Sequence, residues 1–200
     1  MANFAPKTYS SGIDDRNLET QVSGALVANE IFLQEARDEA YKLPTFTVHL
    51  NGFGGKPQTV DIDRNLDGRA DGSAKVNYTW TGNLKSIEID NDNDGKIDTK
   101  FEHKMSSVGN SLGFDVHNML TGKKVAESTS DYYSWFRTID AMTFRRPGSN
   151  DVLGQIKPTF NWAKTPDGLD IYTKSTIKPD TAVKLNRTWF RTLTGFGPTT

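Results

Sequence analysis

The sequence predicts an α+β protein that is mainly antiparallel β, and three observations lead to this class. Residues 14–42 contain no proline and carry apolar residues at helical spacing. After Pro44 the chain changes to short runs in which apolar and polar residues alternate, as in half-buried strands. Turn residues separate these runs at connections too short for parallel crossovers, which favours an antiparallel meander.

Three segments follow from these patterns, and 200 residues are enough for them to pack as one compact domain. Residues 1–43 are expected to form an N-terminal arm and a helix. Residues 44–127 are expected to form a β-repeat segment with acidic loops. Residues 128–200 are expected to form a short helix, further strands and an extended tail.

The long helix is predicted over residues 14–42, and Pro44 ends it because the residue before a proline is disfavoured in a helix. Leu26, Ile31 and Leu33 lie off its main apolar stripe. We therefore expect either deep burial or self-association through this second face. The alternative is that the C-terminal aromatic segment covers it within one chain. The main stripe consists of Leu18, Val22, Ala25, Phe32, Ala36 and Ala40.

The remaining elements are predicted from alternation and turn residues. A short aromatic helix is predicted over residues 131–145, because its large apolar side chains fall at helical spacing before Pro147. Strands are predicted at residues 46–50, 58–63, 74–81, 84–90, 98–105, 112–117, 159–162, 169–173 and 182–185.

Composition excludes several site chemistries. The chain has no cysteine, which rules out disulfides, a thiolate nucleophile, an iron–sulfur cluster and a cysteine-ligated zinc ion. No apolar run approaches the roughly 18 residues that a membrane-spanning helix needs. The N-terminus lacks the apolar stretch of a signal peptide. We therefore expect a cytoplasmic protein, export by another route, or numbering that begins after processing.

Charge is unevenly distributed although the net charge is only −1. Residues 61–102 hold ten acidic and six basic side chains, whereas residues 133–200 hold ten basic and five acidic ones. The middle of the chain is therefore expected to attract cations. The basic residues form no dense cluster, so a solvated face is expected there and nucleic acid is not an expected partner.

One acidic nonapeptide occurs twice, at residues 63–71 and again 27 residues later at 90–98. Both copies follow the pattern Asp-x-Asp/Asn-x-Asp-Gly-x-x-Asp, and a worn third copy at 117–125 keeps only Asn118 and Gly122. Repeats of this period indicate that one supersecondary unit recurs. Each unit is expected to be a strand, a Gly-Asn turn, a strand and an acidic loop.

Alternate oxygen ligands in a tight loop can all point at one hard cation, and glycine at position six permits the sharp turn. Oxygen-only ligation favours Ca²⁺ over Zn²⁺ or Cu²⁺. Asn65 removes one charge from the first loop, so we expect weaker binding there; the alternative is an Asp/Gly-rich turn without metal. The predicted ligands of the first loop are Asp63, Asn65, Asp67, the carbonyl of Arg69, and Asp71. Those of the second loop are Asp90, Asp92, Asp94, the carbonyl of Lys96, and Asp98.

Over residues 57–125 these loops resemble the calcium-binding repeats of bacterial secreted and surface proteins, with loops similar to those of dockerins and type 3 thrombospondin repeats. The resemblance implies structural calcium in a calcium-rich, extracellular setting. The bidentate Glu of helix–loop–helix sites is missing at position twelve, where Ala74 and Phe101 stand. Strand-like flanks further indicate a loop that caps a hairpin.

We expect a calcium-stabilised structural subunit of a virion-type or extracellular assembly, such as a phage capsid, tail or surface-fibre component, and not an enzyme. No catalytic residues are assigned, since His103 beside Glu102 has no nucleophile that the sequence identifies. The expected partners are further copies of the chain or other structural subunits. The alternatives are a secreted calcium-dependent adhesin or carbohydrate-binding module that binds a surface glycan, and a hydrolase with structural calcium.

Overall fold

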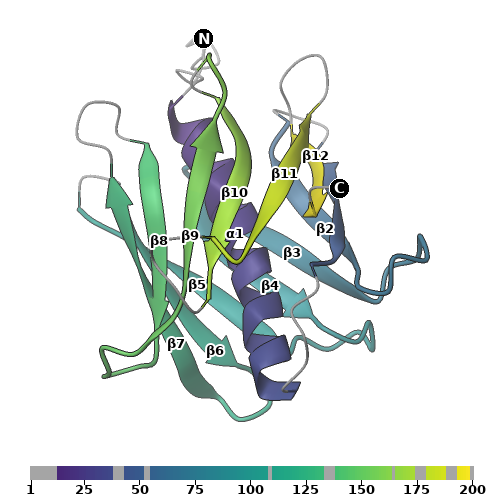
Figure 1. Ribbon diagram of the computed structural model, residues 1–200. Coiled ribbons are helices and arrows are strands. Elements are labelled where there is room, and N and C mark those ends of the chain that lie inside the picture. The colour runs from purple at the N-terminus through teal and green to yellow at the C-terminus, as the bar shows by residue number, and fades with distance from the viewer. Residues whose placement is uncertain are drawn as a thin grey trace, which may run out of the picture.

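The wall of the protein is a closed barrel of twelve antiparallel strands around one helix (Figure 1). This computed structural model describes residues 13–37, 43–51, 55–107, 110–132, 138–163, 165–173, 179–187 and 193–198. The helix is α1 (Ile13–Arg37). The strands are β1 (Thr45–Leu50), β2 (Pro57–Asp63), β3 (Gly72–Tyr78), β4 (Leu84–Asp90), β5 (Thr99–Met105), β6 (Ser111–Asn118), β7 (Lys123–Tyr132), β8 (Ile139–Arg145), β9 (Val152–Phe160), β10 (Pro166–Tyr172), β11 (Thr181–Arg187) and β12 (Leu193–Pro198).

The barrel closes where the first strand pairs with the last. Phe46 on β1 is in register with Phe196 on β12, and their rings stack with centroids 4.2 Å apart. All other neighbours are consecutive strands, so the chain runs up and down around the wall. The connections that follow even-numbered strands therefore lie together at one end. We call this the acidic-loop end, because it holds residues 64–71 and 91–98.

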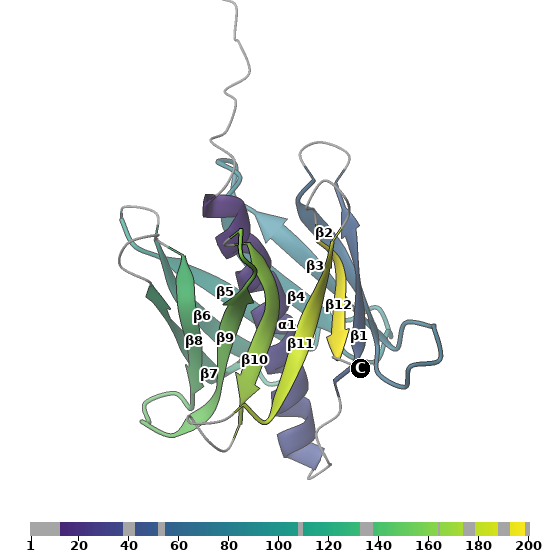
Figure 2. The ribbon, with the colours of Figure 1, turned by 45° about the horizontal axis from the view of Figure 1, so that its top comes forward.

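Helix α1 runs through the interior of the barrel, between the strands at the front and those at the back in both views (Figures 1 and 2). Every residue from Thr20 to Ile31 is buried, on all faces of the helix. The approach to the wall is close at Gly24, where a Cβ atom would lie 1.9 Å from Cε of Met142. The helix thus fills the space in which wider barrels hold a ligand.

Aromatic side chains from the wall pack against Phe32, near the C-terminal end of the helix. The Phe32 ring stacks on Phe101 at 6.5 Å and meets Phe144 edge-on at 5.8 Å. Many charged residues on the strands are exposed or half-buried, as alternation along a strand requires. The exposed or half-buried charged residues include Lys75, Lys85, Lys100, Glu102, Lys157 and Lys184.

Within the described residues, no helix combines the length and apolarity needed to cross a membrane.

The predicted α+β class, with its two helices, is wrong. The protein is a closed antiparallel barrel in which α1 is the one described helix. Closure was not visible in local patterns, because it depends on the pairing of β1 with β12 at opposite ends of the chain. The strands predicted in the middle of the chain form half of a continuous wall and not an open meander.

The short aromatic helix predicted over residues 131–145 is not formed. Residues 139–145 are strand β8, which pairs with β7 on one side and β9 on the other; residues 133–137 lie outside the described part. Met142 and Phe144 alternate into the barrel, where they meet α1. Pairing on both edges outweighs the helical spacing of the apolar residues, because strand formation depends mainly on tertiary context.

The apolar surplus on α1 does not form an interface between chains. Leu26 is fully buried and Ile31 is 5% exposed, because barrel strands lie on both sides of the helix. Of the two expectations for this helix, deep burial is therefore the one that the structure shows. Self-association through α1 is not supported.

Candidate metal centre

The two acidic nonapeptides form the β2–β3 and β4–β5 connections and have the same backbone. Their fourth residues, Leu66 and Asn93, have φ of 63° and 60°. Their sixth residues, Gly68 and Gly95, have φ of 85° and 86°. A left-handed conformation at φ near 85° favours glycine, so any other residue there is strained. The 27-residue sequence repeat is therefore also a structural repeat.

In the second loop the carboxylates of Asp90, Asp92 and Asp98 converge. One oxygen from each lies within 4.8 Å of the others, and among the described residues they form the one acidic or histidine group able to share a metal ion. Backbone N–H groups fix two of them: Gly95 donates to Asp90 Oδ2 at 2.8 Å and Asn91 donates to Asp98 Oδ2 at 2.7 Å. We call these three residues the carboxylate triad.

Asp94, a predicted ligand, does not join the carboxylate triad. Its Oδ2 lies 2.9 Å from Lys96 Nζ, and its Oδ1 accepts a hydrogen bond from the Lys96 N–H at 2.8 Å. The hydrogen bond from the Lys96 side chain lowers the pKa of Asp94, and the same contact raises the pKa of Lys96. A cation that binds Asp94 Oδ2 would therefore compete with the Lys96 ammonium.

In the first loop an amide links the acidic side chains. Asn65 Nδ2 donates to Asp67 Oδ2 and to Asp71 Oδ1, each at 3.3 Å. Asp63 accepts the N–H groups of Leu66 and Gly68 at 2.7 and 2.9 Å. These carboxylates do not converge as the triad of the second loop does, and weaker cation binding at the first loop stays a prediction.

The carbonyls of the seventh residues complete the predicted ligand sets. Arg69 and Lys96 lie on the exposed side of the loops, and their N–H groups donate to Asp67 Oδ1 and Asp94 Oδ1, both at 2.8 Å. This contact holds the seventh residue against the fifth in both loops. Ligation through the two carbonyl oxygens stays a prediction.

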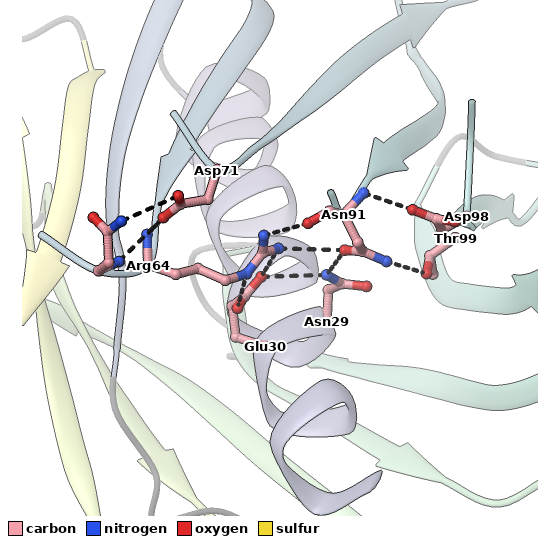
Figure 3. Close-up of polar contacts among 8 residues, drawn as sticks. Asn29, Glu30, Arg64, Asp71, Asn91, Asp98 and Thr99 are labelled. Atoms are coloured by element: carbon pink, nitrogen blue, oxygen red, sulfur yellow. Dashed lines mark hydrogen bonds and ion pairs between the residues drawn. The ribbon is translucent and has the colours of Figure 1, made fainter. Parts of the chain in front are cut away.

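The side chain of the second residue of each loop reaches helix α1, while its backbone N–H bonds the ninth carboxylate (Figure 3). Arg64 forms a two-pronged ion pair with Glu30, with Nε 2.8 Å from Oε2 and Nη2 2.8 Å from Oε1. Asn91 Oδ1 accepts a hydrogen bond from Asn29 Nδ2 at 2.8 Å. The Glu30 side chain is only 1% exposed, so this is a buried ion pair.

Arg64 also joins the two loops directly. Its Nη1 donates to the carbonyl oxygen of Asn91 at 2.5 Å, and its Nη2 lies 3.3 Å from Asn91 Oδ1. Asn91 Nδ2 in turn donates to Thr99 Oγ1 at 3.2 Å. We call Asn29, Glu30, Arg64 and Asn91 the inner polar cluster. The sequence does not predict this cluster, although Asn29 and Glu30 interrupt the apolar run of the helix.

The carboxylate triad meets a distance condition for sharing one Ca²⁺ ion. Two oxygens bound to the same ion at about 2.4 Å are at most about 4.8 Å apart, and each pair within the triad is at least that close. Oxygen ligands select a hard cation over Zn²⁺ or Cu²⁺. Such an ion would relieve the mutual repulsion of three negative charges, which is strong at this separation.

His103 lies apart from the loops, and its side chain faces the interior of the barrel, while its neighbour Glu102 is exposed. Its Nδ1 is 2.9 Å from the Leu84 carbonyl oxygen and its Nε2 is 2.8 Å from Ser111 Oγ. A neutral ring satisfies both contacts, with Nδ1 donating and Nε2 accepting. Burial lowers the pKa of His103.

The lowered pKa of His103 predicts a loss of stability in mild acid. The unfolded histidine takes up a proton near pH 6.5, whereas the folded one resists it. The free energy of unfolding should therefore fall as pH drops below about 6.5, by at most about 1.4 kcal/mol per pH unit. Urea unfolding between pH 5 and 8, compared with His103→Gln, measures this. Substitution of the exposed His49 by Gln should leave the pH dependence of the unfolding free energy unchanged. If the same pH dependence remains in His103→Gln, it does not come from His103.

Comparison with known proteins identifies no family. No protein family and no curated protein matches the chain. Among solved structures, it is similar to a chain of TcdB2-TccC3-Cdc42, at 10% identity over 76% of this chain, with a TM-score of 0.30. It is also similar to chains of TcdB2-TccC3-TEV (11% identity over 74% of this chain, TM-score 0.31) and of the Photorhabdus luminescens Tc holotoxin pore (10% identity over 76% of this chain, TM-score 0.27). The chain spans 9% of the length of each.

Proposed function

We propose that this protein is a structural subunit of an extracellular or virion-type assembly, and that Ca²⁺ at the acidic-loop end stabilises its barrel. The carboxylate triad is the observation that carries the calcium part of the proposal. It lies in a loop whose left-handed backbone positions recur in the first loop, so the chain builds the same kind of turn twice. The loops of extracellular modules bind Ca²⁺ with dissociation constants of about 10⁻⁴–10⁻³ M.

The filled lumen supports a structural role. Small barrels that carry ligands hold them in the lumen. Here α1 is buried along its middle, and Phe32 packs against the rings of Phe101 and Phe144. The side chains of this protein thus fill the part of the lumen that is a ligand cavity in ligand-carrying barrels. Function is then expected at the outer surface and at the two ends.

Ca²⁺ at about 5 mM is expected to stabilise the protein by about 1–2 kcal/mol per occupied site, by mass action at these dissociation constants. For a chain of this size that corresponds to a melting temperature about 2–8 °C higher than in EDTA. Mg²⁺ should do less, because it requires near-octahedral geometry and keeps its waters. Differential scanning calorimetry in EDTA, Ca²⁺ and Mg²⁺ measures the shift.

The matched pair for this experiment is Asp92→Ala and Asp140→Ala. Asp92 belongs to the carboxylate triad, so its loss should remove most of the shift contributed by the second loop. Asp140 is exposed at the start of β8, at the other end of the barrel, and its loss removes the same charge outside the loops. Equal shifts in both variants, or none in the wild type, contradict the calcium site.

Sedimentation of the same samples tests assembly: a monomer at every concentration, with and without Ca²⁺, contradicts the subunit role.

A second candidate function, a carbohydrate-binding adhesin, rests on two exposed tryptophans. Trp80 in the β3–β4 connection is 97% exposed and Trp162 in the β9–β10 connection is 94% exposed. Both connections lie at the end opposite the acidic loops, and an exposed indole offers a flat apolar face with a hydrogen-bond donor at its edge. A glycan array separates the candidates: binding that is lost in Trp80→Ala or Trp162→Ala favours the adhesin.

A further inference from the structure

We propose that Ser111 and His103 form a nucleophile and its general base, and that Ser111 takes the acyl group of a small ester. The two residues lie at the end of the barrel opposite the acidic loops, where β5 ends and β6 begins. This inference goes beyond the proposed calcium function and is independent of it, because no residue of the acidic loops takes part. It also gives His103 the nucleophile that the sequence alone does not identify.

The contacts of His103 are those of a general base. Its Nε2 lies 2.8 Å from Ser111 Oγ, within the range of about 2.6–3.2 Å over which a base can take a proton. Its Nδ1 lies 2.9 Å from the Leu84 carbonyl oxygen. Because a carbonyl oxygen only accepts, Nδ1 carries the proton of the neutral ring and Nε2 presents its lone pair to Ser111. The Leu84 carbonyl thus orients the ring, as the carboxylate does in a serine–histidine–aspartate triad.

Burial keeps His103 able to accept a proton at neutral pH. Its ring packs against Phe114, with the ring centroids 5.2 Å apart. Burial lowers the pKa of His103 from its ordinary value of 6.5. The neutral ring therefore predominates at pH 7 and above, and in that form Nε2 is free to take the hydroxyl proton of Ser111.

Hydroxyl groups from β7 lie beside Ser111. Ser130 Oγ is 3.3 Å from Ser111 Oγ, and the Tyr132 hydroxyl is hydrogen-bonded to Ser111. Ser130 and Tyr132 are two positions apart on the same strand, so their side chains face the same side of it. These two hydroxyls can donate hydrogen bonds to the carbonyl oxygen that becomes negative when Ser111 attacks an ester.

Access to this cluster limits the substrate to a small molecule. His103, Ser130 and Tyr132 are each partly exposed, so solvent reaches the cluster. Ser111 itself is only 4% exposed, so a short acyl group such as acetyl can approach its Oγ more readily than a bulky one. The contacts described for these four side chains include no cationic group that would pair with an anionic substrate. We therefore expect an uncharged ester.

The reaction needs no oxidant or reductant. The proton of Ser111 Oγ passes to His103 Nε2 while Oγ forms a bond to the carbonyl carbon of the ester. The bond from that carbon to the ester oxygen then breaks, and the leaving alkoxide takes the proton from Nε2. An alcohol is released and Ser111 remains acylated. A water molecule that gives its proton to the same Nε2 can then release the acid and restore the serine.

The experiment treats the full chain with p-nitrophenyl acetate in EDTA. The wild type should release p-nitrophenolate in a burst, and peptide mass spectrometry should locate the acetyl group on Ser111. EDTA keeps the acidic loops free of Ca²⁺, so the result does not depend on the calcium function, and a failure here leaves that function standing.

Three variants assign the roles of the two residues. Ser111→Ala should abolish the burst, and His103→Gln should slow it by about 100-fold or more, the usual contribution of a general base. Ser86→Ala is the matched control. Ser86 is also buried, at 2% exposed, but its Oγ accepts a hydrogen bond from Asn77 Nδ2 at 3.2 Å instead of contacting a histidine. This control should keep the wild-type rate.

Each outcome decides for or against the proposal. An acetyl group on Ser111 whose formation depends on His103 supports it. Acetyl groups on lysine or tyrosine alone, an unchanged rate in His103→Gln, or no burst in the wild type overturns it, and the contact between the two residues is then structural only. Should Ser111→Ala not fold, peptide mapping of the wild type still shows whether Ser111 carries the acetyl group.

Discussion

Arg64→Met is expected to lower the free energy of unfolding by about 3–5 kcal/mol, because it leaves the buried Glu30 carboxylate without its partner. The Glu30 side chain is 1% exposed and that of Arg64 is 19% exposed, so water cannot replace the guanidinium. The two hydrogen bonds of the pair, both at 2.8 Å, are lost together. Urea unfolding in EDTA measures the loss without any contribution from a bound cation.

Two further variants give this experiment its controls. Arg146→Met breaks the ion pair with Glu35 on the same helix, where both side chains are more than half exposed, so it should cost less than about 1 kcal/mol. E30Q/R64M leaves no unpaired buried charge and should be more stable than Arg64→Met alone. If Arg64→Met and Arg146→Met lower the free energy of unfolding equally, Glu30 is not shielded from water in the barrel.

Phe101→Ala is expected to cost about 3–5 kcal/mol, the usual range for a fully buried ring. Phe101 is 0% exposed and contacts Phe32 on the helix as well as Phe114 and Phe144 on the wall. The substitution therefore leaves a cavity between helix α1 and the barrel wall, and loses edge-to-face contacts worth about 0.5–1.5 kcal/mol each. The melting temperature should fall by roughly 6–20 °C in calorimetry.

Phe160→Ala is the comparison for this variant. It removes the same ring from the end of β9, where the side chain is 39% exposed, so less apolar surface returns to water and the loss should be below about 1.5 kcal/mol. If Phe101→Ala costs no more than Phe160→Ala, the contact between Phe32 and the wall does not contribute to stability as the structure indicates.

The acidic loops could be predicted from the sequence because they are local. A nonapeptide with oxygen-bearing side chains at alternate positions and glycine at position six defines its own turn. The structure accordingly shows the same left-handed backbone at Gly68 and Gly95. The triad was only partly predictable, since the contact between Asp94 and Lys96 depends on side-chain orientation.

The fold class and the inner polar cluster could not be predicted because they depend on distant contacts. Barrel closure joins Phe46 to Phe196, and no local pattern marks that pairing. The apolar surface of α1 around Leu26 leaves deep burial and an interface open as alternatives, since a helix surrounded by strands and a helix between two chains have the same composition. Glu30 within that apolar run was the one signal of a buried partner, but nothing near it in the sequence points to Arg64.

The placement of α1 inside the barrel determines the order in which the chain can fold. During synthesis α1 is made before any strand, and it lacks a complete wall until β12 has been made. Because closure pairs the first strand with the last, we expect slow folding in which the early strands dock on α1 and the final strands close around it. Once the wall has closed, α1 cannot leave sideways without separating a pair of strands. Release of the helix is then limited by an unfolding barrier, and the folded state is protected kinetically as well as thermodynamically.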